Sequence, residues 1–212
     1  MKLDYTLLRP DASKSEILRH CATAAEKNYY AVCLLPNRIP LAREALRGTE
    51  VKIVGVAGFP LGFDEPDIKL RQAQADADEI DYVVHLSAMR DGLDDPEARK
   101  LLRREARYLA QLGKPLKAIL ETGAFSVKEL EKLLPFVVKE IGPMLTFLKT
   151  STGYFLRDGK IVGAELEKVE LLRKHVEGTR LKIKASGGIR DRQTAEKFIA
   201  AGAARIGASV PL

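Results

Sequence analysis

Short apolar segments alternate with longer amphipathic segments along the whole chain. Near-continuous apolar runs of strand length occur at residues 3–8, 30–35, 51–57, 79–84, 116–120, 145–149, 181–184 and 205–207. The segments between them have helical spacing, at residues 13–27, 40–46, 67–77, 95–111, 126–141, 165–175 and 192–201. Ser13 with Glu16, and Ser126 with Glu129, form the capping-box pattern that starts a helix.

Alternation of buried strands with helices is typical of a parallel α/β architecture. Eight strands predict a closed (β/α)8 TIM barrel, with residues 1–212 as a single domain, although the chain is short for this fold. An open doubly wound sheet is the alternative. It is disfavoured because no glycine-rich dinucleotide fingerprint follows the first strand. Since the first strand begins at once and the chain stops soon after the last, we expect neither an N-terminal helix nor an eighth helix.

Composition narrows the function classes. The chain is 46% hydrophobic and 30% charged, as in ordinary globular proteins, and no apolar run is long enough to span a membrane. The start of the chain has no signal core, so we expect a cytoplasmic protein. The net charge is +6, but basic and acidic residues interleave along helical segments, and no basic–aromatic motif predicts a nucleic-acid partner. Cys21 and Cys33 are expected to be buried thiols.

Two strands end in the same unusual way. The sixth ends at Lys149, followed by Thr150-Ser151-Thr152-Gly153, and the seventh ends at Lys184, followed by Ala185-Ser186-Gly187-Gly188. Burial makes a lysine amine easier to deprotonate, and a neighbouring ammonium has the same effect. A neutral lysine beside a charged one is the requirement for a Schiff base with a carbonyl. A single lysine of this kind would more simply leave the strand for solvent, but two matching strand ends favour a shared site.

Asp81 stands in the middle of the fourth strand, where a buried carboxylate needs a cation or hydrogen-bond donors. One interpretation is a structural ion pair with Lys117 or Lys182. The other is a carboxylate between the two strand-end lysines that moves protons through a water molecule. Strand parity alone does not separate them.

Glycines gather after the last two strands, in Gly187-Gly188 and Gly207-Ala208-Ser209. Phosphate sites of (β/α)8 barrels commonly form after strands 7 and 8, where backbone N–H groups are free to meet an anion. Each glycine could instead serve only a tight turn. Two such turns on adjacent strands predict a phosphate pocket.

These motifs carry a resemblance to a known family. The sequence resembles the deoxyribose-phosphate aldolases, which are class I Schiff-base aldolases on a (β/α)8 barrel, and the match runs in family order from residue 4 to residue 209. The matching motifs are Asp4-Tyr5-Thr6-Leu7-Leu8, Val32-Cys33, Gly58-Phe59-Pro60-Leu61-Gly62, Asp78-Glu79-Ile80-Asp81, Leu116-Lys117, Ile119-Leu120-Glu121-Thr122, Phe147-Leu148-Lys149-Thr150-Ser151-Thr152-Gly153, Lys184-Ala185-Ser186-Gly187-Gly188-Ile189-Arg190 and Arg205-Ile206-Gly207-Ala208-Ser209.

The resemblance implies specific roles. Lys149 aligns with the Schiff-base lysine, Lys184 with the second lysine that keeps it neutral, Asp81 with a proton-relaying aspartate, and Asp4 with an aspartate near the substrate hydroxyls. The positions that align with the phosphate site are Thr152, Gly153, Gly187, Gly188, Gly207 and Ser209. The implied reaction is reversible cleavage of 2-deoxy-D-ribose 5-phosphate to D-glyceraldehyde 3-phosphate and acetaldehyde. It needs no metal or cofactor, because the protonated imine is the electron sink.

Some positions depart from the family pattern. Tyr154 stands where many members have a lysine, Val210 stands where the last phosphate loop has a second serine, and 85–89 replace an asparagine-bearing segment. These departures leave open a Schiff-base aldolase for another phosphorylated sugar, or a barrel that binds sugar phosphate without turnover. Without an eighth helix, the outer apolar face of the last and first strands would be exposed, so we expect a neighbouring subunit to cover it in a homo-oligomer.

Overall fold

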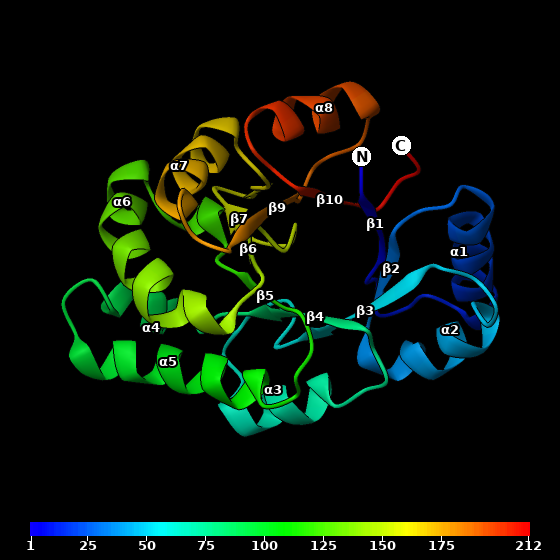
Figure 1. Cartoon of the computed structure of the whole chain (residues 1–212), viewed down its shortest axis with the longest axis horizontal. Helices are drawn as coiled ribbons and strands as arrows, with labels where there is room; N and C mark the ends of the chain where they lie inside the picture. Colours follow the sequence, from blue (N-terminus) through cyan, green and yellow to red (C-terminus); the bar gives the residue numbers. More distant parts are fainter.

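The computed structural model describes all residues, 1–212, and forms a closed eight-stranded parallel barrel with helices around it (Figure 1). The strand order around the barrel is β1-β10-β9-β6-β5-β4-β3-β2. The barrel strands are β1 (Leu3–Leu7), β2 (Ala31–Leu34), β3 (Lys52–Ala57), β4 (Glu79–Val83), β5 (Leu116–Ile119), β6 (Phe147–Lys149), β9 (Lys182–Ser186) and β10 (Arg205–Ala208). The predicted TIM barrel is thus confirmed, and the open sheet is wrong.

Helices cover the outside of the barrel and bury one continuous core between themselves and the strands. They are α1 (Lys14–Glu26), α2 (Ile39–Ala45), α3 (Pro66–Ala73), α4 (Leu86–Asp91), α5 (Pro96–Ala110), α6 (Val127–Phe136), α7 (Leu166–Val176) and α8 (Arg192–Ala200). Short helical turns are η1 (Pro36–Arg38), η2 (Thr122–Ala124), η3 (Val137–Ile141) and η4 (Gly142–Met144). No helix follows β10, and none is both long and apolar enough to cross a membrane.

The helix signals read from the sequence act as expected. Both capping boxes form, with Ser13 accepting from the Glu16 N–H and Ser126 from the Glu129 N–H. The helix expected at 67–77 ends early, at Ala73, and the short helix α4 was not expected. It begins after His85, whose ring accepts from the Ala88 N–H in place of a serine or aspartate cap.

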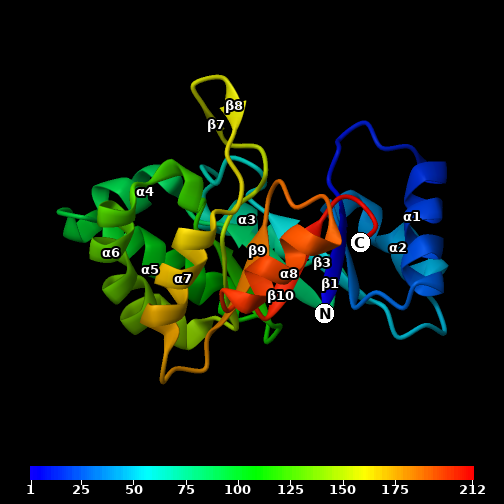
Figure 2. The same cartoon turned by 90° about the horizontal axis from the view of Figure 1, so that it is seen from above.

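A hairpin, β7 (Leu156–Arg157) and β8 (Lys160–Ile161), replaces the loop expected after the sixth strand. It stands out from the body of the barrel (Figure 2). Its two turn residues, Asp158 and Gly159, both have positive φ, which is the type I′ turn that Asp-Gly favours. The Asp-Gly dipeptide was therefore the overlooked signal.

The expected exposed seam between the last and first strands is not observed, and this is a correction. Both chain termini lie there, between α8 and α1 (Figure 1). Yet the outward side chains Leu3 and Ile206 are buried. Tyr5 stacks on His20 of α1 at 3.7 Å between ring centroids, and Tyr29 donates a hydrogen bond to the Leu212 carbonyl. Because α1 and the last residues of the same chain cover the outer face of β1 and β10, this face gives no argument for a second subunit.

Candidate functional site

Three strands bring the two predicted lysines and Asp81 together inside the barrel. Lys149 on β6 and Lys184 on β9 are register partners, so their side chains share the inner face. The Lys149 amine donates to Asp81 Oδ2 at 2.8 Å, and the Lys184 amine donates to the same oxygen at 2.7 Å. Lys117 donates to the other carboxylate oxygen at 2.6 Å. Asp81 therefore has both the structural ion pair and the position between the two strand-end lysines.

A second carboxylate completes the contacts of Lys184. Its amine donates to Asp4 Oδ2 at 2.5 Å, and Arg205 donates to Asp4 Oδ1 at 3.0 Å. Arg205 also pairs with Glu79 at 3.0 Å, and Glu79 pairs with Lys117 at 2.8 Å. The result is a closed ring of ion pairs inside the barrel. Asp4 is fully buried in this ring and does not line the cleft described below.

The cluster fixes the charge of its members. Burial acts to raise the pKa of Asp81, but Lys117, Lys149 and Lys184 hold it well below its ordinary value. Burial acts to lower the pKa of Lys184, but Asp4 and Asp81 outweigh burial and raise it. Lys184 therefore stays an ammonium, and Asp81 stays a carboxylate, throughout the neutral pH range.

A cleft of about 500 Å³ opens at the carboxyl ends of the strands and reaches the Lys149 side chain. Lys184 and Lys117, by contrast, are completely buried. All six positions predicted to bind phosphate line this cleft: Thr152, Gly153, Gly187, Gly188, Gly207 and Ser209. The strand-end motifs that lie far apart in the sequence thus meet in a single hollow.

Two glycine turns give the cleft its backbone donors. Gly187 has φ of +92°, and a Cβ there would lie 3.0 Å from the Gly163 Cα and 3.1 Å from the Ser151 Cβ, so only glycine fits. The N–H groups of Gly153, Gly187 and Gly188 donate no hydrogen bond within the chain. Free N–H groups in adjacent turns form an anion-binding concavity.

Thr152 is held differently from the other cleft residues. Its N–H lies 3.2 Å and its hydroxyl 2.5 Å from Glu121 Oε2. Both of its donors thus face the buried Glu121 carboxylate rather than the cleft.

Several residues of the site escaped sequence reasoning. Arg190 lines the cleft next to the Gly187-Gly188 turn, is exposed, and forms no ion pair or hydrogen bond with the protein. Arg205 and Glu79 complete the ring of ion pairs. The sequence did indicate them, because each is a charged residue within an apolar strand. It did not indicate which of these charged residues would form ion pairs with one another. Of the two candidate partners of Asp81, Lys182 is exposed and only Lys117 pairs with it.

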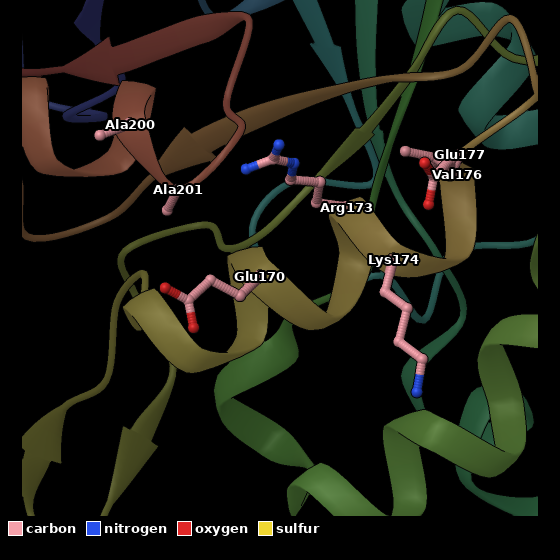
Figure 3. A pocket seen from close by; sticks show the side chains of 7 residues that line it. All are labelled: Glu170, Arg173, Lys174, Val176, Glu177, Ala200 and Ala201. Carbon is pink, nitrogen blue, oxygen red and sulfur yellow. The ribbon is translucent and has the colours of Figure 1, made fainter.

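A second hollow, of about 550 Å³, lies on the outside of the barrel between α7 and α8 (Figure 3). Glu170, Arg173 and Lys174 of α7 and Ala200 of α8 line it, and the Lys174 side chain points away from it toward α6. It holds no buried nucleophile, so the strand-end cleft that reaches Lys149 is the candidate active site. No group of three or more histidine, cysteine or carboxylate side chains is arranged to hold a metal ion.

Known proteins resemble this chain over nearly its full length. No protein-family model matches it. A deoxyribose-phosphate aldolase of Geobacillus sp. is 37% identical over 214 residues, covering 98% of this chain and 90% of the relative. The deoxyribose-phosphate aldolase of Thermus thermophilus is 39% identical over 212 residues, with the same coverage of 98% and 90%.

Solved structures agree with the sequence comparison. The tetrameric deoxyribose-phosphate aldolase of Aeropyrum pernix superposes with a TM-score of 0.80 at 30% identity, covering 98% of this chain and 85% of that one. The shared barrel and the level of identity over the full length leave one family. The chain belongs to the deoxyribose-phosphate aldolase family.

Proposed function

We propose that this protein is a Schiff-base aldolase that cleaves 2-deoxy-D-ribose 5-phosphate reversibly to D-glyceraldehyde 3-phosphate and acetaldehyde. One observation carries the proposal: Lys149 lies at the inner end of a cleft with unpaired backbone donors, and it shares an Asp81 oxygen with the permanently charged Lys184. The family relationship supports the same reaction.

Of the two strand-end lysines, we assign Lys149 as the nucleophile. It is the one that lines the cleft, whereas Lys184 is completely buried and bonded to two carboxylates. Lys184 keeps its ammonium because Asp4 and Asp81 both contact it, so Lys149 is the amine available to attack a carbonyl.

The chemistry then follows from these charges. The Lys149 amine adds to the aldehyde carbon of the open-chain sugar and, with loss of water, forms an imine. A base removes the proton of the C3 hydroxyl, C3 becomes the aldehyde carbon of the departing D-glyceraldehyde 3-phosphate, and the electron pair of the broken C2–C3 bond moves into the protonated imine to give an enamine. Protonation of that enamine carbon and hydrolysis release acetaldehyde. We assign the relay of these protons to Asp81 and Lys184, through a water molecule because neither side chain lines the cleft.

The other end of the cleft suits the phosphate. We assign its binding to the free N–H groups of Gly153, Gly187 and Gly188, with Gly207 and Ser209 on the adjacent strand end and the unpaired Arg190 guanidinium as the counter-charge. Thr152 shapes this pocket through its backbone turn. Asp4 acts on the site through Lys184, since no cleft surface reaches it.

A Schiff-base aldolase for a different phosphorylated sugar is the alternative, because Tyr154 lines the cleft. Its ring packs against Phe59, with 5.2 Å between the ring centroids. Val210, by contrast, does not line the cleft. A bulky aromatic side chain at the mouth would change which sugars fit. Comparing kcat/KM for deoxyribose phosphate with values for other pentose and tetrose phosphates separates the two.

The decisive experiment is borohydride reduction in the presence of acetaldehyde, followed by intact mass and peptide mapping. A two-carbon adduct on Lys149 is the expected result. A folded protein with no adduct would overturn the aldolase proposal and favour a non-catalytic sugar-phosphate barrel. We also infer a homo-oligomer, supported by the tetrameric Aeropyrum pernix relative, which light scattering tests. The cytoplasmic location and the absence of a nucleic-acid partner stay predictions.

A further inference from the structure

The carboxyl end of β5 carries a buried acid that the proposed reaction does not use. Glu121 is 2% exposed and forms no ion pair. Burial raises the pKa of its carboxyl, although the hydrogen bonds from Thr152 and the charge of Lys149 act to lower it. A buried acid without a salt-bridge partner is costly, so its position needs a reason.

The partners of Glu121 supply one. Its carboxylate takes both donors of Thr152, the backbone N–H and the hydroxyl, and the Thr152 hydroxyl oxygen in turn accepts from the Tyr154 N–H at 3.0 Å. The turn 152–154 is therefore held by hydrogen bonds that start from this carboxylate. Gly153 is at the centre of this turn, with its own N–H free to face the cleft.

The backbone at Glu121 is held in an unusual conformation. Its φ of 49° and ψ of 57° lie in the left-handed region, which costs a non-glycine residue roughly 1 kcal/mol. Asparagine or glycine would adopt this conformation more easily, but glycine has no side chain and asparagine has a shorter one with a single acceptor oxygen. The Thr152 N–H lies 3.4 Å from Oε1 and 3.2 Å from Oε2, so an amide in place of the carboxylate would present its NH₂ group to this donor in either orientation.

The residues after Glu121 are tied to the same loop. Lys168 of α7 donates to the Thr122 carbonyl at 3.0 Å, and Arg157 of β7 donates to the Gly123 carbonyl. A Cβ on Gly123 would lie 2.8 Å from the Val162 side chain, so the two segments pack closely. The end of β5 thus braces the loop between β6 and α7 at several points. Glu121 is the one brace that touches the turn lining the cleft.

We propose that Glu121 is a positioning residue that fixes the Thr152–Tyr154 turn so that the Gly153 N–H meets the phosphate of the substrate. This inference rests on the proposed function. A general structural role would impair both phosphate binding and the reaction of Lys149. The proposed role of Glu121 affects phosphate binding only. Binding of the sugar phosphate should therefore depend on Glu121, whereas imine formation by Lys149 with an unphosphorylated aldehyde should not.

The test uses Glu121→Gln and Thr152→Val, with Glu129→Gln in the exposed capping box of α6 as the matched control. We expect Glu121→Gln to raise KM for deoxyribose phosphate about 10- to 100-fold, the range for one hydrogen bond to a charged group, with kcat changed less than about threefold. Borohydride trapping with acetaldehyde should keep its wild-type rate. Thr152→Val should raise KM in the same direction, and the double variant should be no worse than the poorer single variant.

Distinct outcomes would overturn the inference. Unchanged KM in folded Glu121→Gln, or additive effects in the double variant, would show that the carboxylate does not act through Thr152. Slow acetaldehyde trapping in Glu121→Gln alone would place its effect at Lys149 instead. Failure of the wild-type protein to trap acetaldehyde would overturn the proposed function itself, and that result is recognised independently of any variant. If Glu121→Gln does not fold, Thr152→Val alone decides, since it removes the same hydroxyl contact from the other side.

Discussion

Lys149 and Lys184 are register partners on adjacent parallel strands, and both amines donate to one oxygen of Asp81, at 2.8 and 2.7 Å. Strand pairing fixes this relationship, because partners in register present their side chains to the same face. The two lysines nevertheless differ in environment. Lys184 has a second carboxylate, Asp4, and no surface, whereas Lys149 has the cleft. That difference is the reason for assigning Lys149, and not Lys184, as the nucleophile.

Lys149→Ala should abolish both acetaldehyde trapping and cleavage of the sugar phosphate. Removing a covalent nucleophile costs about 1000-fold or more, because the remaining groups have no acceptor for the bond being broken. A coupled assay for glyceraldehyde phosphate and the borohydride experiment measure the two losses. Lys182→Ala, which changes an exposed lysine two positions from Lys184, is the control and should keep wild-type activity.

Lys184→Leu should lose most of the activity at neutral pH and regain part of it at alkaline pH. Without the Lys184 ammonium, Asp4 and Asp81 each lose a cation, and their negative charge opposes the release of a proton from the cluster. The rate measured from pH 6 to about pH 10 should show its rising limb displaced to higher pH. Lys184→Arg, which keeps the charge, should show a smaller displacement. Normal turnover of Lys184→Leu at pH 7 would contradict the assigned role.

Arg190→Ala should weaken binding of the phosphate end alone. Its guanidinium lines the cleft beside the glycine turn and has no partner in the protein, so its loss exposes no unpaired group. We expect KM for the sugar phosphate to rise about 10- to 100-fold and kcat/KM for unphosphorylated deoxyribose to stay unchanged. Arg192→Ala is the control, because Arg192 pairs with Glu196 on the exposed face of α8. Equal losses with both substrates would show that Arg190 does not meet the phosphate.

Lys69→Met should destabilise the fold by roughly 3–5 kcal/mol, as expected when one member of a buried ion pair is removed. Lys69 is completely buried, pairs with Glu105, and donates to the carbonyls of Gly62 at 2.7 Å and Val83 at 2.9 Å. The substitution leaves the Glu105 carboxyl buried without its cation. Urea unfolding measures the loss, and the double variant Lys69→Met with Glu105→Gln should recover part of it.

Stability should fall as pH falls from about 6.5 to about 4 because of His20. Burial lowers the pKa of His20 from 6.5 to about 4, although its hydrogen bond with the Tyr5 carbonyl acts to raise it. The unfolded chain therefore binds a proton at His20 in this window, while the folded chain does not, so acid favours unfolding. The effect is on the order of 2 kcal/mol.

Unfolding in urea at several pH values measures this dependence. His20→Phe keeps an aromatic ring against Tyr5 and cannot titrate. As pH falls through the window, the free energy of unfolding of the wild type should therefore fall relative to that of the variant. The carboxylates of the barrel interior do not interfere in this comparison, because both proteins contain them. A constant difference between the two proteins would contradict the assignment.

Elements with strong local signals were predicted well. The eight strands and the capped helices follow from hydrophobic period and from side chains that bond to their own helix start, as at Ser13 and Ser126. Elements that depend on less familiar signals were not. The helix after His85 uses an imidazole cap, and the β7–β8 hairpin depends on an Asp-Gly turn in a segment otherwise read as a loop.

The sequence by itself determined the barrel, the two strand-end lysines, the acid in the fourth strand and the glycine turns, because strand period and turn chemistry are local. Only the tertiary structure decided the partners of these groups. It closed the interior ring through Arg205 and Glu79, buried Asp4 away from the cleft and turned both donors of Thr152 toward Glu121. It also sealed the expected seam with α1 and the chain end. Such choices depend on which distant strands become neighbours and on how charged side chains pair in the buried interior of the barrel.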